Sequence, residues 1–237
     1  MQIPFISQEI SHFLKHRRAR LAAGDFGFSV GRRRGNGLRR EEVAQLSGVS
    51  VTWYTWLEQG KSIHVSQSML LRLADALRLS ATEQSYFLSL IRERDAVLGD
   101  SEKDLLPSTL VKTVDAISTP AFVRNPRWDL LYWNTAAAAF VGDWTSYTTS
   151  INILRLAFLD RKHQATILEW ERTAGEMVAQ FRNEFGHHAR YPGMSTLIEE
   201  LMEDSEIFRR HWEKQEVSLR EIGLRTFRHP LQGDVTF

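Results

Sequence analysis

Apolar residues recur at helical spacing along the first hundred positions of the chain. Between Ser7 and Ala22 the apolar residues share one side, which predicts a helix with that stripe inward and its basic residues outward: Ile10, Phe13, Leu14 and Leu21. The same spacing predicts helices over 39–47, after Ser50 and over 66–79. Ser80 and Glu83 have the spacing of a capping box, so a fifth helix is expected to about Arg94. A loop rich in glycine and arginine is predicted over 24–37.

The second half of the chain mixes strand and helix patterns. A hairpin is predicted from 121–124 and 129–133 across Asn125-Pro126, and Asn134 can cap a helix over 135–141. After a cap at Asp160, apolar residues at helical spacing predict one long helix: Ile167, Trp170, Ala174, Met177, Val178 and Phe181. The pattern then predicts two further helices, over 194–204 and 205–214, and returning strands over 217–237. The second half is therefore expected to be an α+β domain. We therefore expect domains at 1–96 and 109–237, joined by a linker over 97–108.

The run LRREEVAQLSGVSVTWYTWLEQG, residues 38–60, has the pattern of a helix-turn-helix. Gly48 can take the positive φ at which the first helix ends, and Ser50 can cap the second. Tyr54 and Leu57 fall on the inner face of the second helix, which leaves an outer face of Val51, Thr52, Trp53, Thr55 and Trp56. Such a helix suits the DNA major groove. An ordinary helical hairpin is the alternative, although it does not need a cap and an inward pair in this register.

Basic charge is concentrated beside this run. From His12 to Arg40 there are nine basic residues against one acid, whereas the whole chain carries a net charge of only +1. Arg39 and Arg40 lie at the N-terminal end of the first motif helix, where backbone N–H groups also favour an anion. We expect both to contact DNA phosphates. A solvated basic face is the alternative for any single arginine.

Several other classes of protein are disfavoured by the sequence. The chain has no cysteine, which excludes disulfides and cysteine-ligated zinc. It has no uninterrupted apolar stretch of membrane-spanning length and no apolar signal segment, so we expect a cytoplasmic protein without a membrane partner. The adjacent pair His187 and His188 would point to different sides, and no nucleophile elbow, phosphate loop or dinucleotide-binding string occurs. We therefore expect no enzyme activity, no metal and no cofactor.

Two strings in the first half carry a family resemblance: GLRREEVAQLSGVSVTWYTWLEQG and MLLRLADALRLSATEQSYFLSL. They resemble helix-turn-helix proteins of the xenobiotic-response-element (XRE, or Cro/repressor) family, in the subgroup with an MmyB-like ligand-binding domain. In the second half DLLYWNTAAAAF, NILRLAFLD and RHPLQGDVTF are similar to successive blocks of that PAS-like sensor domain. The resemblance covers nearly all of residues 8–237. It implies a mainly α protein: a five-helix Cro/repressor-type domain followed by an α+β, PAS-like sensor domain.

The resemblance also implies a DNA-reading surface. Together with the motif analysis it gives these candidate DNA-binding residues: Arg39, Arg40, Ser50, Val51, Thr52, Trp53, Thr55 and Trp56. Glu58 matches a position that usually ties the recognition helix to the first helix, here to Arg17 or Arg18. Trp56 stands where the family commonly has arginine, which bears on the operator preferred. The family's sensor domain normally continues past Phe237, so the sequence is shortened there or its sheet has an open edge for a partner strand or second subunit.

The sensor domain of this family implies a small hydrophobic, fatty-acid-like ligand. The candidate ligand-binding residues are Trp128, Trp133, Phe158, Trp170, Phe181 and Arg182. Plain core packing is the alternative for the aromatic residues, and a surface salt bridge is the alternative for Arg182 and for Arg155. We expect a homodimer on a pseudo-palindromic, double-stranded DNA operator. The competing hypothesis is an antitoxin-type DNA-binding protein whose C-terminal half binds a protein partner.

Overall fold

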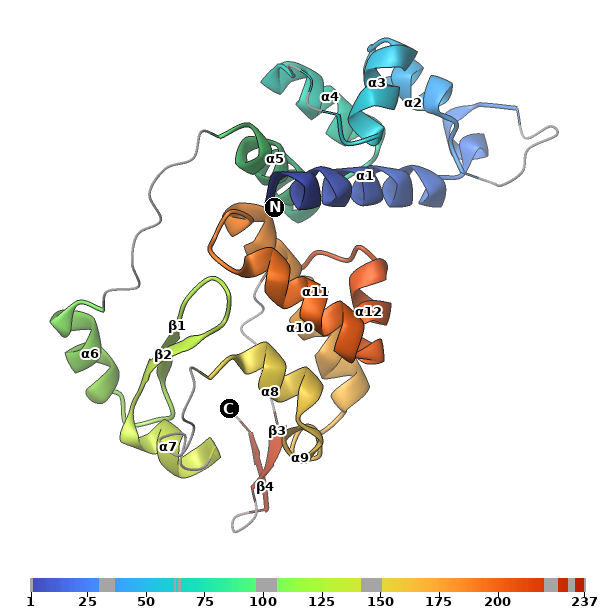
Figure 1. The fold of residues 1–237 in the computed structure, drawn as a ribbon. Helices are drawn as coiled ribbons and strands as arrows, with labels where there is room; N and C mark the ends of the chain where they lie inside the picture. Colours follow the sequence, from blue (N-terminus) through green and yellow to red (C-terminus); the bar gives the residue numbers. More distant parts are fainter. Residues whose placement is uncertain are drawn as a thin grey trace.

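The N-terminal half is helical, as the apolar spacing predicts. The computed structural model of the chain describes residues 2–29, 37–61, 63, 65–96, 106–141, 151–219, 226–229 and 233–236. The N-terminal half contains α1 (Gln2–Arg20), a short 3-10 helix (Ala23–Phe26), α2 (Arg40–Ser47), α3 (Val51–Glu58), α4 (Gln67–Ala76) and α5 (Ala81–Asp95), as Figure 1 shows. The first helix begins at Gln2 instead of Ser7, and the 3-10 helix begins one residue before the predicted loop and overlaps its start. Residues 30–36 of that loop, including Arg32, Arg33 and Arg34, lie outside the described residues.

Side-chain caps fix where these helices begin. Ser50 Oγ accepts a hydrogen bond from the backbone N–H of Trp53 at 3.1 Å, at the start of α3. At the start of α5, Ser80 Oγ accepts from the N–H of Glu83 at 3.3 Å, and the Glu83 carboxylate accepts from the N–H of Ser80 at 2.9 Å. The predicted cap and the predicted capping box are therefore confirmed. These bonds satisfy backbone donors that the first turn of a helix leaves without a partner.

The C-terminal half is an α+β arrangement. It contains α6 (Ser108–Asp115), β1 (Phe122–Arg124), β2 (Leu130–Trp133), α7 (Thr135–Val141), α8 (Ile153–Leu159), α9 (Arg161–Gln164), α10 (Trp170–His188), α11 (Met194–Asp204), α12 (Glu206–Glu213), β3 (Thr226–His229) and β4 (Gly233–Thr236). β1 pairs antiparallel with β2, with Phe122 opposite Trp133, and β3 pairs antiparallel with β4. The strands of the described residues thus form two separate two-stranded sheets. The fold class predicted from the sequence is confirmed.

Four helices of the C-terminal half differ from the prediction. Asp160 caps only the short α9, and the long helix begins at Trp170 because Glu169 takes a left-handed conformation with φ 52°. Ile167 of the predicted stripe therefore precedes the long helix. α6 and α8 were not predicted from the sequence, although Asn152 caps α8 by accepting from the N–H groups of Leu154 and Arg155. Most of the predicted linker, residues 97–105, lies outside the described residues, and α6 begins at its last position.

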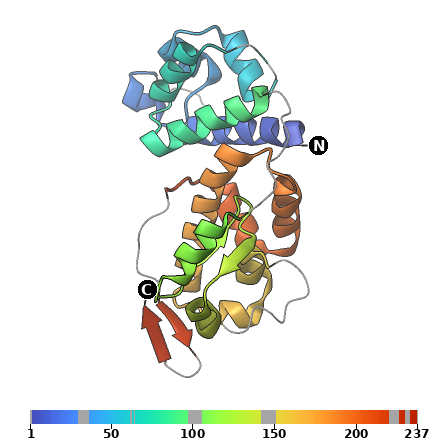
Figure 2. The same ribbon diagram turned by 90° about the vertical axis from the view of Figure 1, so that its left-hand side faces the viewer.

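The two halves of the chain share one hydrophobic core. α5 of the N-terminal half packs along α10 of the C-terminal half, and Figure 2 shows the end of α10 reaching the layer formed by α1 and α5. Phe5 on α1 meets Phe185 on α10 edge to face, with ring centroids 5.7 Å apart. Gly186 lies against the ring of Tyr86 so closely that a Cβ atom there would collide with it. This glycine allows α5 and α10 to approach.

A buried ion pair lies within this shared core. Glu9 on α1 accepts a hydrogen bond from Arg182 Nη1 on α10 at 2.6 Å, and the side chains are 5% and 0% exposed. Trp212 Nε1 donates to the other carboxylate oxygen of Glu9 at 3.3 Å. Burial by itself would raise the pKa of Glu9, but the Arg182 charge and the hydrogen bonds to Glu9 outweigh it and lower that pKa. Both charges are therefore present in the folded protein.

Replacing Glu9 alone should destabilise the chain strongly. The Glu9→Ala protein keeps the buried Arg182 guanidinium without its carboxylate, which typically costs about 3–5 kcal/mol in the free energy of unfolding. Urea denaturation of the full chain measures this cost. The control is the double variant Glu9→Met, Arg182→Met, in which apolar side chains replace both charges and the loss should be clearly smaller. An equal loss in the two proteins would contradict a paired, buried charge.

Candidate nucleic-acid interface

The turn between α2 and α3 is fixed by backbone geometry and by a buried inner face. Gly48 takes φ 65° at the end of α2, and the backbone N–H of Val49 donates to the carbonyl of Ala44 at 3.0 Å. Ala44, Tyr54 and Leu57 are each no more than 1% exposed, so the predicted inner face is confirmed. α3 is thereby held in one orientation on the N-terminal half.

The opposite face of α3 is open to solvent at most of the predicted positions. Val51 is 41% exposed and Trp56 is 44% exposed, while Ser50 and Thr52 are also exposed. Thr55 is half-buried. Two large apolar side chains exposed on one short helix are unusual on a free surface and are typical of a contact surface. Lys61 Nζ lies 5.7 Å from the Trp56 ring centroid, which adds a cation at the C-terminal end of this face.

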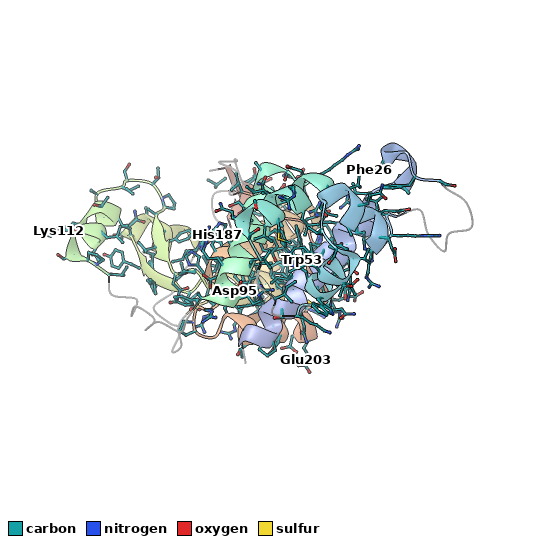
Figure 3. All side chains as sticks on the ribbon, turned by 90° about the horizontal axis from the view of Figure 1, so that it is seen from above. Phe26, Trp53, Asp95, Lys112, His187 and Glu203 are labelled. Carbon is teal, nitrogen blue, oxygen red and sulfur yellow. The ribbon has the colours of Figure 1, made fainter. Side chains whose placement is uncertain are left out.

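Trp53 differs from its neighbours on the predicted outer face. This residue, labelled in Figure 3, has a half-buried side chain that packs against the hydrophobic core. Trp53 therefore contributes to holding α3 in place as well as to its surface. The helical spacing could not separate these two roles, because position 53 lies at the border between the inner and outer faces.

Glu58 connects three helices beneath the candidate interface. Its carboxylate is 0% exposed and accepts from Arg18 Nε of α1 at 2.7 Å and from Arg40 Nε of α2 at 2.7 Å. The predicted tie to α1 therefore goes to Arg18. Arg17 pairs instead with Glu83 at 2.5 Å. Burial alone would raise the pKa of Glu58, but the hydrogen bonds and charge of Arg18, followed by Arg40, lower it.

The two arginines at the start of α2 are in different situations. Arg39 is the N-terminal cap residue of α2 and is exposed, and its backbone N–H donates to Glu42 Oε2 at 2.7 Å. Arg40 uses its Nε for Glu58 and keeps 41% of its side chain exposed. Both arginines therefore lie at the positive end of the α2 dipole, next to α3. Arg40 also has a structural role that the sequence analysis did not predict.

Most of the candidate ligand-binding aromatics form one continuous row through the C-terminal half. Neighbouring ring centroids in this aromatic row are 5.2–6.2 Å apart in the order Trp128, Phe181, Trp212, Phe208, Phe158 and Trp170. Trp128, Phe158 and Phe181 are no more than 5% exposed, and Trp170 is half-buried. Trp133 lies apart from the row, beside Leu130 and Ile151. Phe208 and Trp212 were not predicted as site residues, although their spacing of four residues places them on one side of α12.

The salt bridge considered for Arg182 is buried instead of lying on the surface. Its guanidinium is fully buried against Glu9, Tyr86, Gln215 and the Trp212 carbonyl, and its contact with a ligand stays a prediction. Two of the elements that cover Arg182, α1 and α5, come from the other half of the chain. Arg155 does form the salt bridge considered for it, with Glu200 at 2.6 Å.

Comparisons with known families match both halves of the chain. Residues 106–237 match the family described as the MmyB-like transcription regulator ligand binding domain, and residues 9–87 match a helix-turn-helix domain family. Neither family is one of enzymes. None of the curated proteins compared with the chain matches it. Among the residues that the structure describes, no helix has both the length and the apolar composition needed to cross a membrane.

The buried carboxylate of Glu58 should make stability depend on pH. Its pKa in the folded protein lies below the ordinary value of 4.5, so the unfolded chain binds the proton more readily. Glu58 therefore stabilises the fold fully above that value, and the contribution is lost as pH falls through the folded pKa. We expect the free energy of unfolding to fall more steeply below pH 4.5 in the wild type than in Glu58→Gln. Equal pH profiles in urea titrations would count against the ionised Glu58 cluster.

Proposed function

Because the chain belongs to the family of MmyB-like transcription regulators, we propose that it is a sequence-specific DNA-binding regulator whose C-terminal domain senses a small hydrophobic ligand. The observation that carries the DNA-binding half is the solvent-exposed face of α3 beside Arg39. This face consists of Ser50, Val51, Thr52, Thr55 and Trp56, with Trp53 at its border.

In this proposal the residues of α2 and α3 have separate tasks. Arg39, and the exposed end of Arg40, contact phosphates and set the position of the protein on the duplex. Thr52 and its exposed neighbours enter the major groove, which is roughly 12 Å wide, and read base edges and thymine methyl groups. Trp56 offers an apolar surface where an arginine would offer charge, so it favours contact with methyl groups or sugars. A homodimer would place two such helices about 34 Å apart on a pseudo-palindromic operator.

The sensing half of the proposal rests on the family and on the aromatic row. We infer that Trp128, Phe158, Trp170 and Phe181 contact the ligand after the row has repacked, since their rings already form one apolar layer. Trp133 would contribute from β2. A fatty-acid-like molecule fits such a lining because its binding depends on buried apolar area. Native mass spectrometry of the protein as purified tests this, since a bound apolar molecule supports the ligand class and a polar one contradicts it.

Replacing Arg39 by alanine should weaken binding to all duplexes alike. Loss of one phosphate contact lowers the slope of log affinity against log salt by about 0.9. Fluorescence anisotropy with the best and with unrelated duplexes, between low and moderate salt, measures both quantities. Arg161→Ala is the matched control, because this exposed arginine on α9 changes net charge equally outside the proposed interface. A slope unchanged from wild type in Arg39→Ala would refute the phosphate contact.

Replacing Thr52 by alanine should change which operator is preferred. The variant loses a hydroxyl that can bond a base edge, so discrimination at one or two base pairs should fall by about 1–3 kcal/mol, while affinity for unrelated DNA stays the same. Selection from a random duplex pool, followed by sequencing, measures this preference. Thr196→Ala, an exposed threonine on α11, is the control. Uniform weakening across all sequences would contradict base reading by Thr52.

A further inference from the structure

One helix, α1, contacts both functional parts of the molecule. In its first half, Glu9 binds Arg182 and Trp212 of the C-terminal half, and near its end Arg18 holds Glu58 at the C-terminal end of α3. These two positions on α1 are about 13 Å apart along the helix axis. Because a packed helix moves largely as a unit, displacement at Glu9 reaches Arg18 directly. α1 therefore connects the aromatic row to α3 and can transmit a displacement from one to the other.

The contacts at the Glu9 end form a compact buried cluster, which we name the joint: Glu9, Tyr86, Arg182, Trp212 and Gln215. Arg182 Nη1 donates to Glu9 at 2.6 Å, to Gln215 Oε1 at 3.1 Å and to the Tyr86 hydroxyl at 3.3 Å. Arg182 Nη2 donates to the carbonyl of Trp212. Glu9 and Tyr86 come from the N-terminal half and the other three residues from the C-terminal half. Every hydrogen bond of Glu9 or Tyr86 within the joint crosses between the halves.

Trp212 belongs to both the joint and the aromatic row. Its ring is stacked on Phe208 with centroids 5.6 Å apart and an interplanar angle of 13°, and it also contacts Phe181 at 6.2 Å. The Arg182 guanidinium carbon lies 3.8 Å from the centroid of the same ring. A change in the packing of Phe181 or Phe208 therefore moves the ring that supports Arg182 and the N–H that binds Glu9.

We propose that the joint and α1 couple the packing of the aromatic row to the position of α3. This inference rests on the proposed function, in which a small molecule repacks the row and α3 reads DNA. The packing of α5 along α10 and the covalent connection between the halves are alternative routes. The covalent connection leads to α6, which lies away from α2 and α3 (Figure 1). The joint instead reaches α3 through two ion pairs and one helix.

The chemistry of the joint favours two discrete arrangements. A buried arginine and glutamate are tolerated only while their hydrogen bonds are complete, and loss of one partner weakens the rest of such a network. Displacement of Trp212 removes a donor to Glu9 and the aromatic face beneath Arg182 at the same time. The joint is then either closed, with α1 held against α10 and α12, or open. A ligand that binds better to one arrangement shifts the population of the other.

The same substitution, tryptophan to phenylalanine, at two positions of the aromatic row tests the coupling between the row and α3. Trp212→Phe keeps a stacked ring but removes the N–H that binds Glu9. Trp170→Phe is the matched control, because it removes an indole at the other end of the row whose Nε1 has no hydrogen-bond partner among the described residues. Hydrogen exchange of the full chain, without DNA or ligand, measures amide opening in α3, whose described residues make no hydrogen bond or ring contact with Trp212. We expect opening of α3 to rise about fivefold or more in Trp212→Phe and less than twofold in Trp170→Phe.

The outcomes decide the coupling without any assumption about DNA. Unchanged exchange of α3 in Trp212→Phe, or an equal increase in both variants, overturns the proposal. If Trp212→Phe does not fold, the same comparison is made between Glu9→Gln and Glu184→Gln, since the Glu184 carboxylate pairs with Arg124 entirely within the C-terminal half.

A DNA arm separates this proposal from the proposed function. Duplex selected by the wild type should slow exchange in α10 and α12 of the wild type and of Trp170→Phe, and should do so at least twofold less in Trp212→Phe, because coupling is reciprocal. Equal slowing in all three proteins contradicts coupling through the joint, although it still supports DNA binding. Failure of the wild type to bind any duplex overturns the proposed function, whereas the exchange of α3 without DNA still decides the coupling.

Discussion

The ion pair between Glu9 and Arg182 constrains how the two halves of this chain are arranged. Both side chains are at most 5% exposed, and each charge is paired with the opposite charge from the other half. Such a pair contributes little net stability over apolar residues of the same size, but separation of its partners within the core is very unfavourable. The pair therefore acts mainly on specificity: it requires α1 and α10 to meet in one register. The contact of Gly186 with Tyr86 requires the same arrangement sterically.

The helix-turn-helix could be predicted because its requirements are local. A glycine with positive φ, a serine cap and an inward pair three residues apart all lie within one short run, and the structure places each as expected. The family model supports the same conclusion for residues 9–87. The family pattern predicts that Glu58 pairs with either Arg17 or Arg18. The choice of Arg18 depends on how α1 packs against α3, which the sequence does not show.

The features that could not be predicted depend on distant residues or on single backbone angles. Arg182 and Glu9 are separated by 173 positions, and nothing in the neighbourhood of either residue indicates the other. α8 has the sequence ILRLAFL, whose apolar residues occupy nearly every position, so no helical period stands out. The positive φ of Glu169 interrupts a stripe that continues in the sequence. The predicted ligand-binding role of the aromatic residues stays a prediction.

The continuous core has a consequence for how such proteins diversify. Regulators are often described as modular proteins, in which one DNA-binding domain can be fused to many different ligand-binding domains. Here a different C-terminal domain packed against α5 would need glycine at the position of Gly186 and a cationic side chain at the position of Arg182. Exchange of whole domains between relatives is therefore restricted to pairs whose residues match at the contact between α5 and α10. New ligand preferences are more accessible by substitutions within the existing C-terminal domain.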